Sequence, residues 1–379
     1  MRRYGRRLPL RRTVLMPRLP RPDFWLLGAV AALAGFGVVM VFNVSYFHAQ
    51  ARFNDPLLFF RKHMIALAIG SAALLAMSRV RIEFLERWAN LIFAVSMFAL
   101  FLVLLPHVGV ARGGAQRWLG LGGFSLQPSE FAKIGVVLFA ARWISSRRDE
   151  IRSFRSGVLP LLVVVGLCGL LVMAQPDFGT TVILGVLALL MLFAGGARPA
   201  QMSGLLAAGL VLFATGAMAA PYRVKRLMAF LDPWSQSKEG AFQLVQSLIA
   251  FGSGGLTGVG LGQSRQKMWF LPEAHTDFVF ALIGEELGLI GALVVLVLFA
   301  VVAVRGYRIA ARHPDSFGSL LAFGLTSLII LSAVTNVGVV LGVLPTKGLA
   351  LPFLSYGGSA LLSSMVQVGI LAALSRMTG

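Results

Sequence analysis

Ten long apolar stretches constrain the fold of this chain more than any other feature. A helix needs about 20 mostly apolar residues to cross the hydrocarbon core of a bilayer, and each stretch has about that length. The predicted spans are residues 24–46, 58–78, 86–105, 128–145, 158–174, 179–195, 199–219, 277–304, 318–343 and 356–375. Only 13% of the residues are charged, whereas a soluble domain has about 25%. The sequence therefore predicts an all-α, polytopic membrane protein with ten transmembrane helices.

Lysine and arginine residues predict the orientation of these spans. If the N-terminus lies inside, the inner segments contain 21 of these residues and the outer loops contain 10. Six of the outer ones fall in residues 220–276, a segment long enough that the positive-inside rule constrains it little. We therefore expect both termini to be cytoplasmic, and residues 220–276 to form a large extracytoplasmic loop between the seventh and eighth helices.

The chain is predicted to form one transmembrane domain, residues 24–379, after a basic tail, residues 1–23. The tail contains eight arginines and is predicted to be disordered; the apolar run after it is too long for a cleavable signal peptide. The net charge of +19 does not indicate nucleic-acid binding, because the basic residues are spread over short loops instead of one folded face. It indicates membrane topology and contact with anionic membrane lipids. Cys168 lies in an apolar run and is predicted to be a buried hydrophobe.

Asp277 is a carboxylate at the membrane boundary, where the eighth span begins. The other carboxylates on the predicted outer side are Asp55, Glu130, Asp177, Asp232, Glu239 and Glu273. A carboxylate poised at low dielectric can act as a general base. Glu285 and Glu286 lie roughly 12–13 Å deeper at the helical rise per residue. They are interpreted either as structural partners of a polar cavity and a neighbouring helix, or as part of a transport or proton-relay path.

The outer segment GVARGGAQRWLGLGGFSLQPSEFAK lies between the third and fourth spans. It places Arg117 and Trp118 in a glycine-rich, flexible stretch. Ser129 is predicted to cap the fourth helix, with Glu130 in its first turn, and Lys133 follows one turn later on the same face. A lysine this close to hydrocarbon needs a partner or an aqueous cavity. Either Glu130 and Lys133 pair locally, or both line a cavity.

Basic side chains also occur in two other outer segments. The long loop begins with Arg223 and Arg226 and contains a predicted amphipathic helix, residues 241–251, lying on the membrane. Its glycine-rich stretch GSGGLTGVGLG lacks the lysine-serine ending and the strand context of a nucleotide-binding loop. The last outer loop, LGVLPTKGLALPFLSYGGSALL, carries Lys347. This lysine either anchors the chain at the interface or binds an anion.

These outer features together predict a class of substrate. An aspartate and many basic side chains beside hydrocarbon suit a molecule with an apolar tail and an anionic head, since Arg and Lys bind phosphate or pyrophosphate. His275, near Asp277, is interpreted either as a turn residue or as a group that orients the aspartate. The five histidines show no metal-ligand spacing, and the sequence contains no zinc cluster, nucleophile elbow or Walker motif.

Three motifs carry a resemblance to a known family: GGAQRWLGLGGFSLQPSEFAK, LPEAHTDFVFALIGEELGLIG and LPTKGLALPFLSYGGSALL. From about residue 24 onward the chain resembles the SEDS family (shape, elongation, division and sporulation; FtsW, RodA and SpoVE). The sequences of its motifs are closer to those of FtsW than to those of RodA. The resemblance implies a ten-helix peptidoglycan glycosyltransferase of the bacterial inner membrane. Such an enzyme polymerises lipid II on the outer face, at the division septum. Its expected partners are a class B penicillin-binding transpeptidase and other division membrane proteins.

The resemblance also implies site residues. Asp277 matches the family's essential aspartate and is expected to be the general base that deprotonates the acceptor 4-hydroxyl. A further set is expected to bind the substrate, and its basic members would stabilise the departing pyrophosphate. This set comprises Trp118, Arg117, Glu130, Lys133, Arg223, Arg226, Lys267, His275, Lys347 and Ser355. No cofactor is firmly implied, although a divalent cation, Mg²⁺ or Mn²⁺, would help the same step.

Other functions remain open on the sequence. A lipid II flippase would also have intramembrane charges and a headgroup cavity, but it needs access from both faces. A non-enzymatic scaffold for division partners would tolerate substitution of the loop charges. Within the family, a RodA-type elongation polymerase is the alternative. Polymer formation from lipid II by the purified chain, with and without its transpeptidase partner, discriminates best among the classes.

Overall fold

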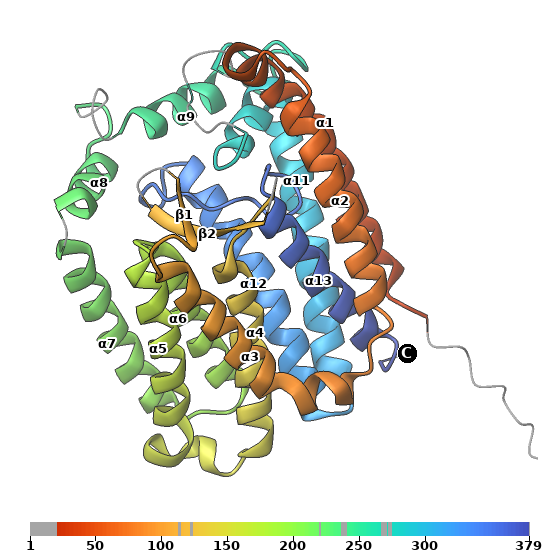
Figure 1. The fold of residues 1–379 in the computed structure, drawn as a ribbon, viewed down its shortest axis with the longest axis vertical. Helices are drawn as coiled ribbons and strands as arrows, with labels where there is room; N and C mark the ends of the chain where they lie inside the picture. The colour runs from red at the N-terminus through yellow and green to blue at the C-terminus, as the bar shows by residue number, and fades with distance from the viewer. Residues whose placement is uncertain are drawn as a thin grey trace, which may run out of the picture.

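The computed structural model describes residues 21–112, 115–121, 124–219, 221–235, 241–266, 271 and 275–378. Within these residues, a helix coincides with each of the ten predicted spans. The helices are α1 (Phe24–Phe53), α2 (Leu58–Met77), α3 (Ile82–Leu104), α4 (Pro128–Ser146), α5 (Leu159–Ala174), α6 (Phe178–Ala194), α7 (Pro199–Met218), α11 (Val279–Arg312), α12 (Ser316–Val340) and α13 (Gly358–Ser375). They form the bundle seen in Figure 1.

Eight of these helices are long and apolar enough to cross a membrane. The other two are α4, which contains the charged residues Glu130, Lys133 and Arg142, and α6, which has only 17 residues. Both pack inside the bundle, α4 against α3 and α12, and α6 against α5 and α12. The protein is therefore an integral membrane protein. Which face of the membrane each end of the bundle meets stays a prediction.

A small antiparallel sheet follows α3 and makes the all-α prediction incomplete. Its strands are β1 (Gly109–Arg112), β2 (Ala115–Leu121) and β3 (Phe124–Leu126), in the order β1-β2-β3. Val110 pairs with Trp118 and Ala111 pairs with Gln116, so Arg117 is the extra residue of a bulge in β2. The many glycines of this segment pointed to a flexible loop, but glycine also occurs where strands bend or approach other backbone closely. Strand pairing satisfies the backbone polar groups of the segment.

The long segment between α7 and α11 contains α8 (Pro221–Leu231) and α9 (Phe242–Ser253). The predicted amphipathic helix 241–251 coincides with α9, but its environment differs from the prediction. The helix packs on α11 and α12, and Leu244, Val245 and Ala250 are buried. The Ser247 hydroxyl donates to the Val340 carbonyl oxygen at 2.8 Å. The amphipathic pattern of this helix therefore indicates one face that packs against the bundle and another face that is exposed.

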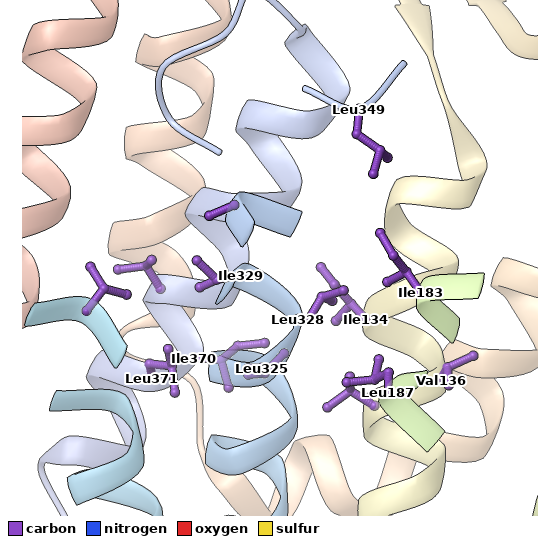
Figure 2. Close-up of a cluster of buried hydrophobic side chains, with 14 of the residues drawn as sticks. Ile134, Val136, Ile183, Leu187, Leu325, Leu328, Ile329, Leu349, Ile370 and Leu371 are labelled. Atoms are coloured by element: carbon purple, nitrogen blue, oxygen red, sulfur yellow. The ribbon is translucent and has the colours of Figure 1, made fainter. Parts of the chain in front are cut away.

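The core of the bundle lies where α4, α6, α12 and α13 meet. Figure 2 shows side chains of these helices gathered in one cluster: Ile134, Val136, Ile183, Leu187, Leu325, Leu328, Ile329, Ile370 and Leu371. Leu349, from the loop after α12, lies at the edge of this cluster. The loop that carries Lys347 is thus anchored in the core two residues beyond the lysine.

Helix α11 is broken at Gly288, whose φ of 65° and ψ of −164° are not helical. A break leaves backbone groups on both sides without helical partners, and the glycine-rich segment 254–262 supplies them. Leu289 N–H donates to Gly255 O, Ile290 N–H to Leu256 O, Val259 N–H to Glu285 O, and Gly260 N–H to Glu286 O, over 2.9–3.2 Å. The segment therefore replaces the missing helical hydrogen bonds across the break.

The carboxylates of Glu285 and Glu286 hold the next part of the same loop. Glu285 accepts hydrogen bonds from the Ser264 hydroxyl, at 2.5 Å, and from the Arg265 N–H, at 3.0 Å. Glu286 accepts from the Asn43 side-chain amide. Of the two interpretations of this pair, the structure supports structural partners.

Candidate active site

A cavity of about 240 Å³ lies where α6, α7, α8 and α12 meet the loop after α12. Most of its wall is apolar and includes Val182, Ile183, Val186, Phe213 and Leu331. Four basic side chains also line it: Arg117, Arg223, Arg226 and Lys347. All four belong to the set predicted to bind substrate. The cavity therefore combines cations with an apolar surface, as the predicted substrate class requires.

A larger hollow of about 690 Å³ lies at the opposite end of the bundle, where α4 ends and α12 begins. Arg148, Asp149 and His313 are among its lining residues, and none of the predicted site residues lines it. Arg148 there donates to the Ser316 hydroxyl at 2.8 Å. The smaller cavity is the candidate site, because the chemically distinctive residues converge on it.

Arg117 is fixed by backbone oxygens at the end of α5. Its Nε donates to the Gln175 carbonyl oxygen at 2.9 Å, and its Nη2 donates to the Pro176 carbonyl oxygen. The last carbonyls of a helix have no helical partner, so they readily accept from a basic side chain. Arg117 is the bulged residue of β2, and Trp118, the next residue, pairs with Val110 of β1. Of these two predicted site residues, Arg117 lines the cavity and Trp118 is not among its lining residues.

The two arginines of α8 contact different segments that line the cavity. Nη1 of Arg223 donates to the Gly216 carbonyl oxygen near the end of α7 at 2.8 Å, and the guanidinium lies 5.0 Å from the centre of the Phe178 ring at the start of α6. Nη1 of the more exposed Arg226 lies 3.4 Å from the Thr346 carbonyl oxygen. The start of the outer loop is therefore tied to α6, α7 and the Lys347 loop.

Lys347 lies across the first turn of α6. A methyl group at Gly179 would stand 1.2 Å from its Cε and 2.1 Å from its Nζ, so only glycine leaves room for the side chain there. Burial lowers the pKa of Lys347 to about 7, although the Asp177 carboxylate nearby opposes the shift; the Lys133 ammonium adds to it. Lys347 can therefore change its charge near neutral pH.

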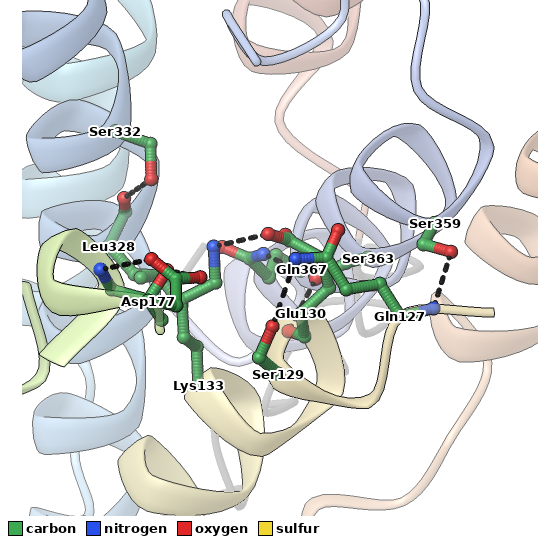
Figure 3. Close-up of polar contacts among 11 residues, drawn as sticks. Gln127, Ser129, Glu130, Lys133, Asp177, Leu328, Ser332, Ser359, Ser363 and Gln367 are labelled. Atoms are coloured by element: carbon green, nitrogen blue, oxygen red, sulfur yellow. Dashed lines mark hydrogen bonds and ion pairs between the residues drawn. The ribbon is translucent and has the colours of Figure 1, made fainter. Parts of the chain in front are cut away.

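Buried charges of α4 and α6 lie next to this lysine. Asp177 caps α6, with one oxygen accepting from the Thr180 N–H at 3.1 Å and the other from the Thr180 hydroxyl at 2.8 Å. On α4, Lys133 Nζ donates to Glu130 Oε1 at 2.8 Å, and both side chains are largely buried. Figure 3 shows Lys133 between Asp177 and Glu130. The local Glu130–Lys133 pair is thus present, and neither residue is among those that line the cavity.

Asp277 lies at the rim of the cavity, just before α11. Its carboxylate faces Gly348, a lining residue of the cavity: a methyl group at Gly348 would stand 2.8 Å from Asp277 Oδ2. The Asp277 backbone carbonyl accepts a hydrogen bond of 2.8 Å from the side-chain amide of Asn336 in α12. The residue is half-buried. The structure therefore places the predicted base against the loop that carries Lys347.

Three other predicted site residues are placed differently. His275 is buried, with its ring 4.9 Å from that of Phe59 and 5.6 Å from that of Tyr356. The Ser355 hydroxyl accepts from the Leu351 N–H at 2.9 Å, which closes a turn after α12. Lys267 lies outside the described residues. His275 and Ser355 thus contribute to packing and turn geometry around the site.

Gly179, Gly348 and Asn336 shape the site but were not predicted. Nothing in the sequence separates these two glycines from the other 40, because their roles depend on contacts with Lys347 and Asp277 from distant segments. Asn336 had a detectable signal, since an amide inside an apolar span needs a polar partner.

A divalent cation does not find a ready set of protein ligands here. Among the described residues, no three histidine, cysteine, aspartate or glutamate side chains are grouped to hold a metal ion. Near the cavity, Asp177 already accepts from Thr180, and Glu130 accepts from Lys133.

Comparison with known proteins identifies the family. The family model described as cell cycle protein FtsW/RodA/SpoVE matches residues 24–379. Stage V sporulation protein E of Bacillus subtilis is 42% identical over 355 residues, which cover 94% of this chain and 97% of that protein. A probable peptidoglycan glycosyltransferase FtsW of Geobacter metallireducens is 40% identical over 365 residues, covering 96% and 97%.

Solved structures have the same fold. A chain from a peptidoglycan synthase complex, described as coordinating polymerisation and crosslinking, superposes with a TM-score of 0.77 at 26% identity and covers 94% of this chain and 98% of that one. The rod shape determining protein RodA of Thermus thermophilus gives 0.71 at 26% identity, covering 94% and 97%. The family match, the close relatives and the shared fold agree, and the chain belongs to the FtsW/RodA/SpoVE family of cell cycle proteins.

Proposed function

We propose that this protein polymerises lipid II into glycan strands on the outer face of the bacterial inner membrane during septal wall synthesis, with Asp277 as the general base. The relatives support the reaction class, since several at 39–43% identity are named probable peptidoglycan glycosyltransferase FtsW. A similarly close relative is named for sporulation, and the solved RodA for rod shape. The septal role follows the larger number of FtsW relatives.

In the proposed reaction, the Asp277 carboxylate takes the proton of the acceptor sugar's 4-hydroxyl. The hydroxyl oxygen then bonds to the donor's anomeric carbon, and the bond from that carbon to the pyrophosphate oxygen breaks with inversion. The electron pair leaves on undecaprenyl pyrophosphate, so the leaving group needs no protonation. Arg117, Arg223, Arg226 and Lys347 stabilise its charge.

One arrangement carries this proposal: four basic side chains line a largely apolar cavity, and Asp277 faces Gly348 at its rim. The apolar wall suits the start of a polyprenyl chain, and the cations suit its pyrophosphate. Each part of the reaction therefore has a counterpart within one short region.

The test is polymerisation of lipid II by purified Asp277→Asn, which preserves size but cannot accept the proton. Loss of a general base costs about 10²–10⁴-fold in rate. Asp232→Asn is the matched control, because Asp232 is an exposed carboxylate of the same outer segment whose oxygen accepts from Ser235 N–H at 3.3 Å. The control should polymerise normally. Normal chain extension by Asp277→Asn would refute the assignment of the base, and a lipid-translocation assay on both variants tests the flippase alternative.

We further propose a crosslinking transpeptidase of the class B penicillin-binding type as a partner. The support is the solved relative, which belongs to a complex that coordinates polymerisation and crosslinking. Co-purification of the full chain with such a transpeptidase, and comparison of polymerisation with and without it, tests this partner. A rate that is unchanged at saturating transpeptidase, with no stable complex, would argue against it.

A further inference from the structure

We propose that Asn336 is a positioning residue that holds the Asp277 segment and the Lys347 loop in one geometry; this inference rests on the function proposed above. The Asn336 side chain is buried near the end of α12. Its Nδ2 donates to the Asp277 carbonyl oxygen at 2.8 Å and to the Leu349 carbonyl oxygen at 2.6 Å. One amide group thus spans two segments that are 72 residues apart in the sequence.

The orientation of this amide follows from its neighbours. Both contacts are carbonyl oxygens, which only accept hydrogen bonds, so the NH2 group must face them. With both N–H bonds used, Asn336 Oδ1 is buried without a hydrogen-bond partner. An unpaired buried acceptor destabilises the folded state. The amide is therefore held in one orientation, with both of its N–H bonds directed at the two segments.

One of the two bridged segments carries the proposed base, and the other carries a basic side chain of the cavity. The Asp277 carboxylate faces Gly348, while Lys347 extends across Gly179 toward α6. Leu349 anchors its loop in the core. Asn336 therefore sets how far the base stands from the cation at the cavity, and this distance must match that between the acceptor hydroxyl and the pyrophosphate.

The experiment measures kcat and KM for lipid II with full-length Asn336→Leu, which has nearly the same size but lacks the donors. We expect a loss of about 10²-fold in kcat of the folded variant, because misplacing reacting groups by about 1 Å has this effect. Ser332→Ala is the control. Ser332 is a buried polar residue one turn earlier, and its hydroxyl donates only within α12, to Leu328 O at 2.9 Å. Its kinetics should match the wild type.

A double-mutant cycle distinguishes positioning from general loosening. If Asn336 acts by placing Lys347 relative to the base, Asn336→Leu should cost much less in a Lys347→Met background than in the wild type. If the two substitutions acted independently, their fold-losses in kcat would multiply in the double variant. A merely structural role of Asn336 would give this multiplication. Multiplying losses, or a wild-type kcat for Asn336→Leu, would overturn the proposal.

A second variant keeps the proposal testable if Asn336→Leu does not fold. Gly348→Ala introduces a methyl group 2.8 Å from Asp277 Oδ2 and disturbs the same spacing from the loop side. It should also lower kcat, and a wild-type kcat would count against the proposal. Asp277→Asn is assayed alongside. If Asp277→Asn is active, the proposed function fails; if it is inactive while Asn336→Leu and Gly348→Ala are normal, only the positioning role fails.

Discussion

Lys347 links the charge of the site to pH. Because burial lowers its pKa to about 7, its positive charge is present below pH 7 and is lost as the pH rises through 7. The protonated fraction falls from about nine-tenths at pH 6 to about one-tenth at pH 8. We expect the KM of the wild type for lipid II to rise several-fold over this range, whereas Lys347→Arg, which stays charged, should change little.

The measurement is a pH series of lipid II polymerisation at several substrate concentrations. Lys225→Arg is the matched control, since Lys225 is an exposed residue of α8 that does not line the cavity; it should follow the wild-type profile. An identical pH profile for the wild type and Lys347→Arg would show that Lys347 does not supply the titrating charge.

Single residues also show the limit of sequence reasoning. The sequence singled out Arg117, Arg223 and Lys347 as candidate site residues, because charged residues beside hydrocarbon are rare and usually functional. All three line the cavity. Sequence could not show that His275 packs against aromatic rings or that Ser355 closes a turn, since both facts depend on neighbours from distant segments. Their assignment as substrate ligands stays a prediction.

At the scale of elements, the break in α11 depends on Gly288. An alanine there would be strained at φ 65°, and its methyl group would stand 2.4 Å from Gly258 N and 2.5 Å from Leu256 O. We expect Gly288→Ala to lose at least about 1–3 kcal/mol of stability and to expose segment 254–262. Melting temperature and limited proteolysis of the purified protein measure both effects.

The matched control for this prediction is Gly35→Ala. Gly35 is an exposed glycine of α1 with no atom within 4 Å of an added methyl group, and alanine favours a helix over glycine by about 1 kcal/mol. Its melting temperature should stay the same or rise slightly. Equal melting temperatures for the two variants would show that the break does not require glycine.

Elements were predictable to the extent that they follow a strong period or composition. Among the described residues, a helix coincides with each of the ten apolar runs, and the ends of these helices differ from the predicted ends by up to eight residues. The sheet 109–126 was missed because its glycines conceal the alternation of a strand. The break in α11 was missed because the hydrogen bonds that stabilise it come from a separate loop, segment 254–262. The sequence of the helix itself does not indicate these contacts.

At the scale of the whole molecule, the predicted orientation can be tested with cysteine chemistry. Cys168 is the only cysteine and is buried, so the wild type should give little background. In spheroplasts, a membrane-impermeant maleimide should label Trp234→Cys, in the exposed outer segment after α8, without permeabilisation. Asp149→Cys, in the exposed connection between α4 and α5, should react only after permeabilisation. The opposite pattern would reverse the topology.

Two helices that line the cavity, α12 and α7, differ in how much of their surface is buried in the protein, and we expect them to differ in how easily they move. In α12, 72% of the most apolar window is buried, against 6% in α7. The α12 wall is therefore held by protein contacts, whereas the α7 wall lies mostly at the surface of the bundle, where lipid is expected. If a polyprenyl chain enters and leaves the cavity as proposed, we expect α7 to move outward, while α12 keeps the Asp277 segment in place through Asn336.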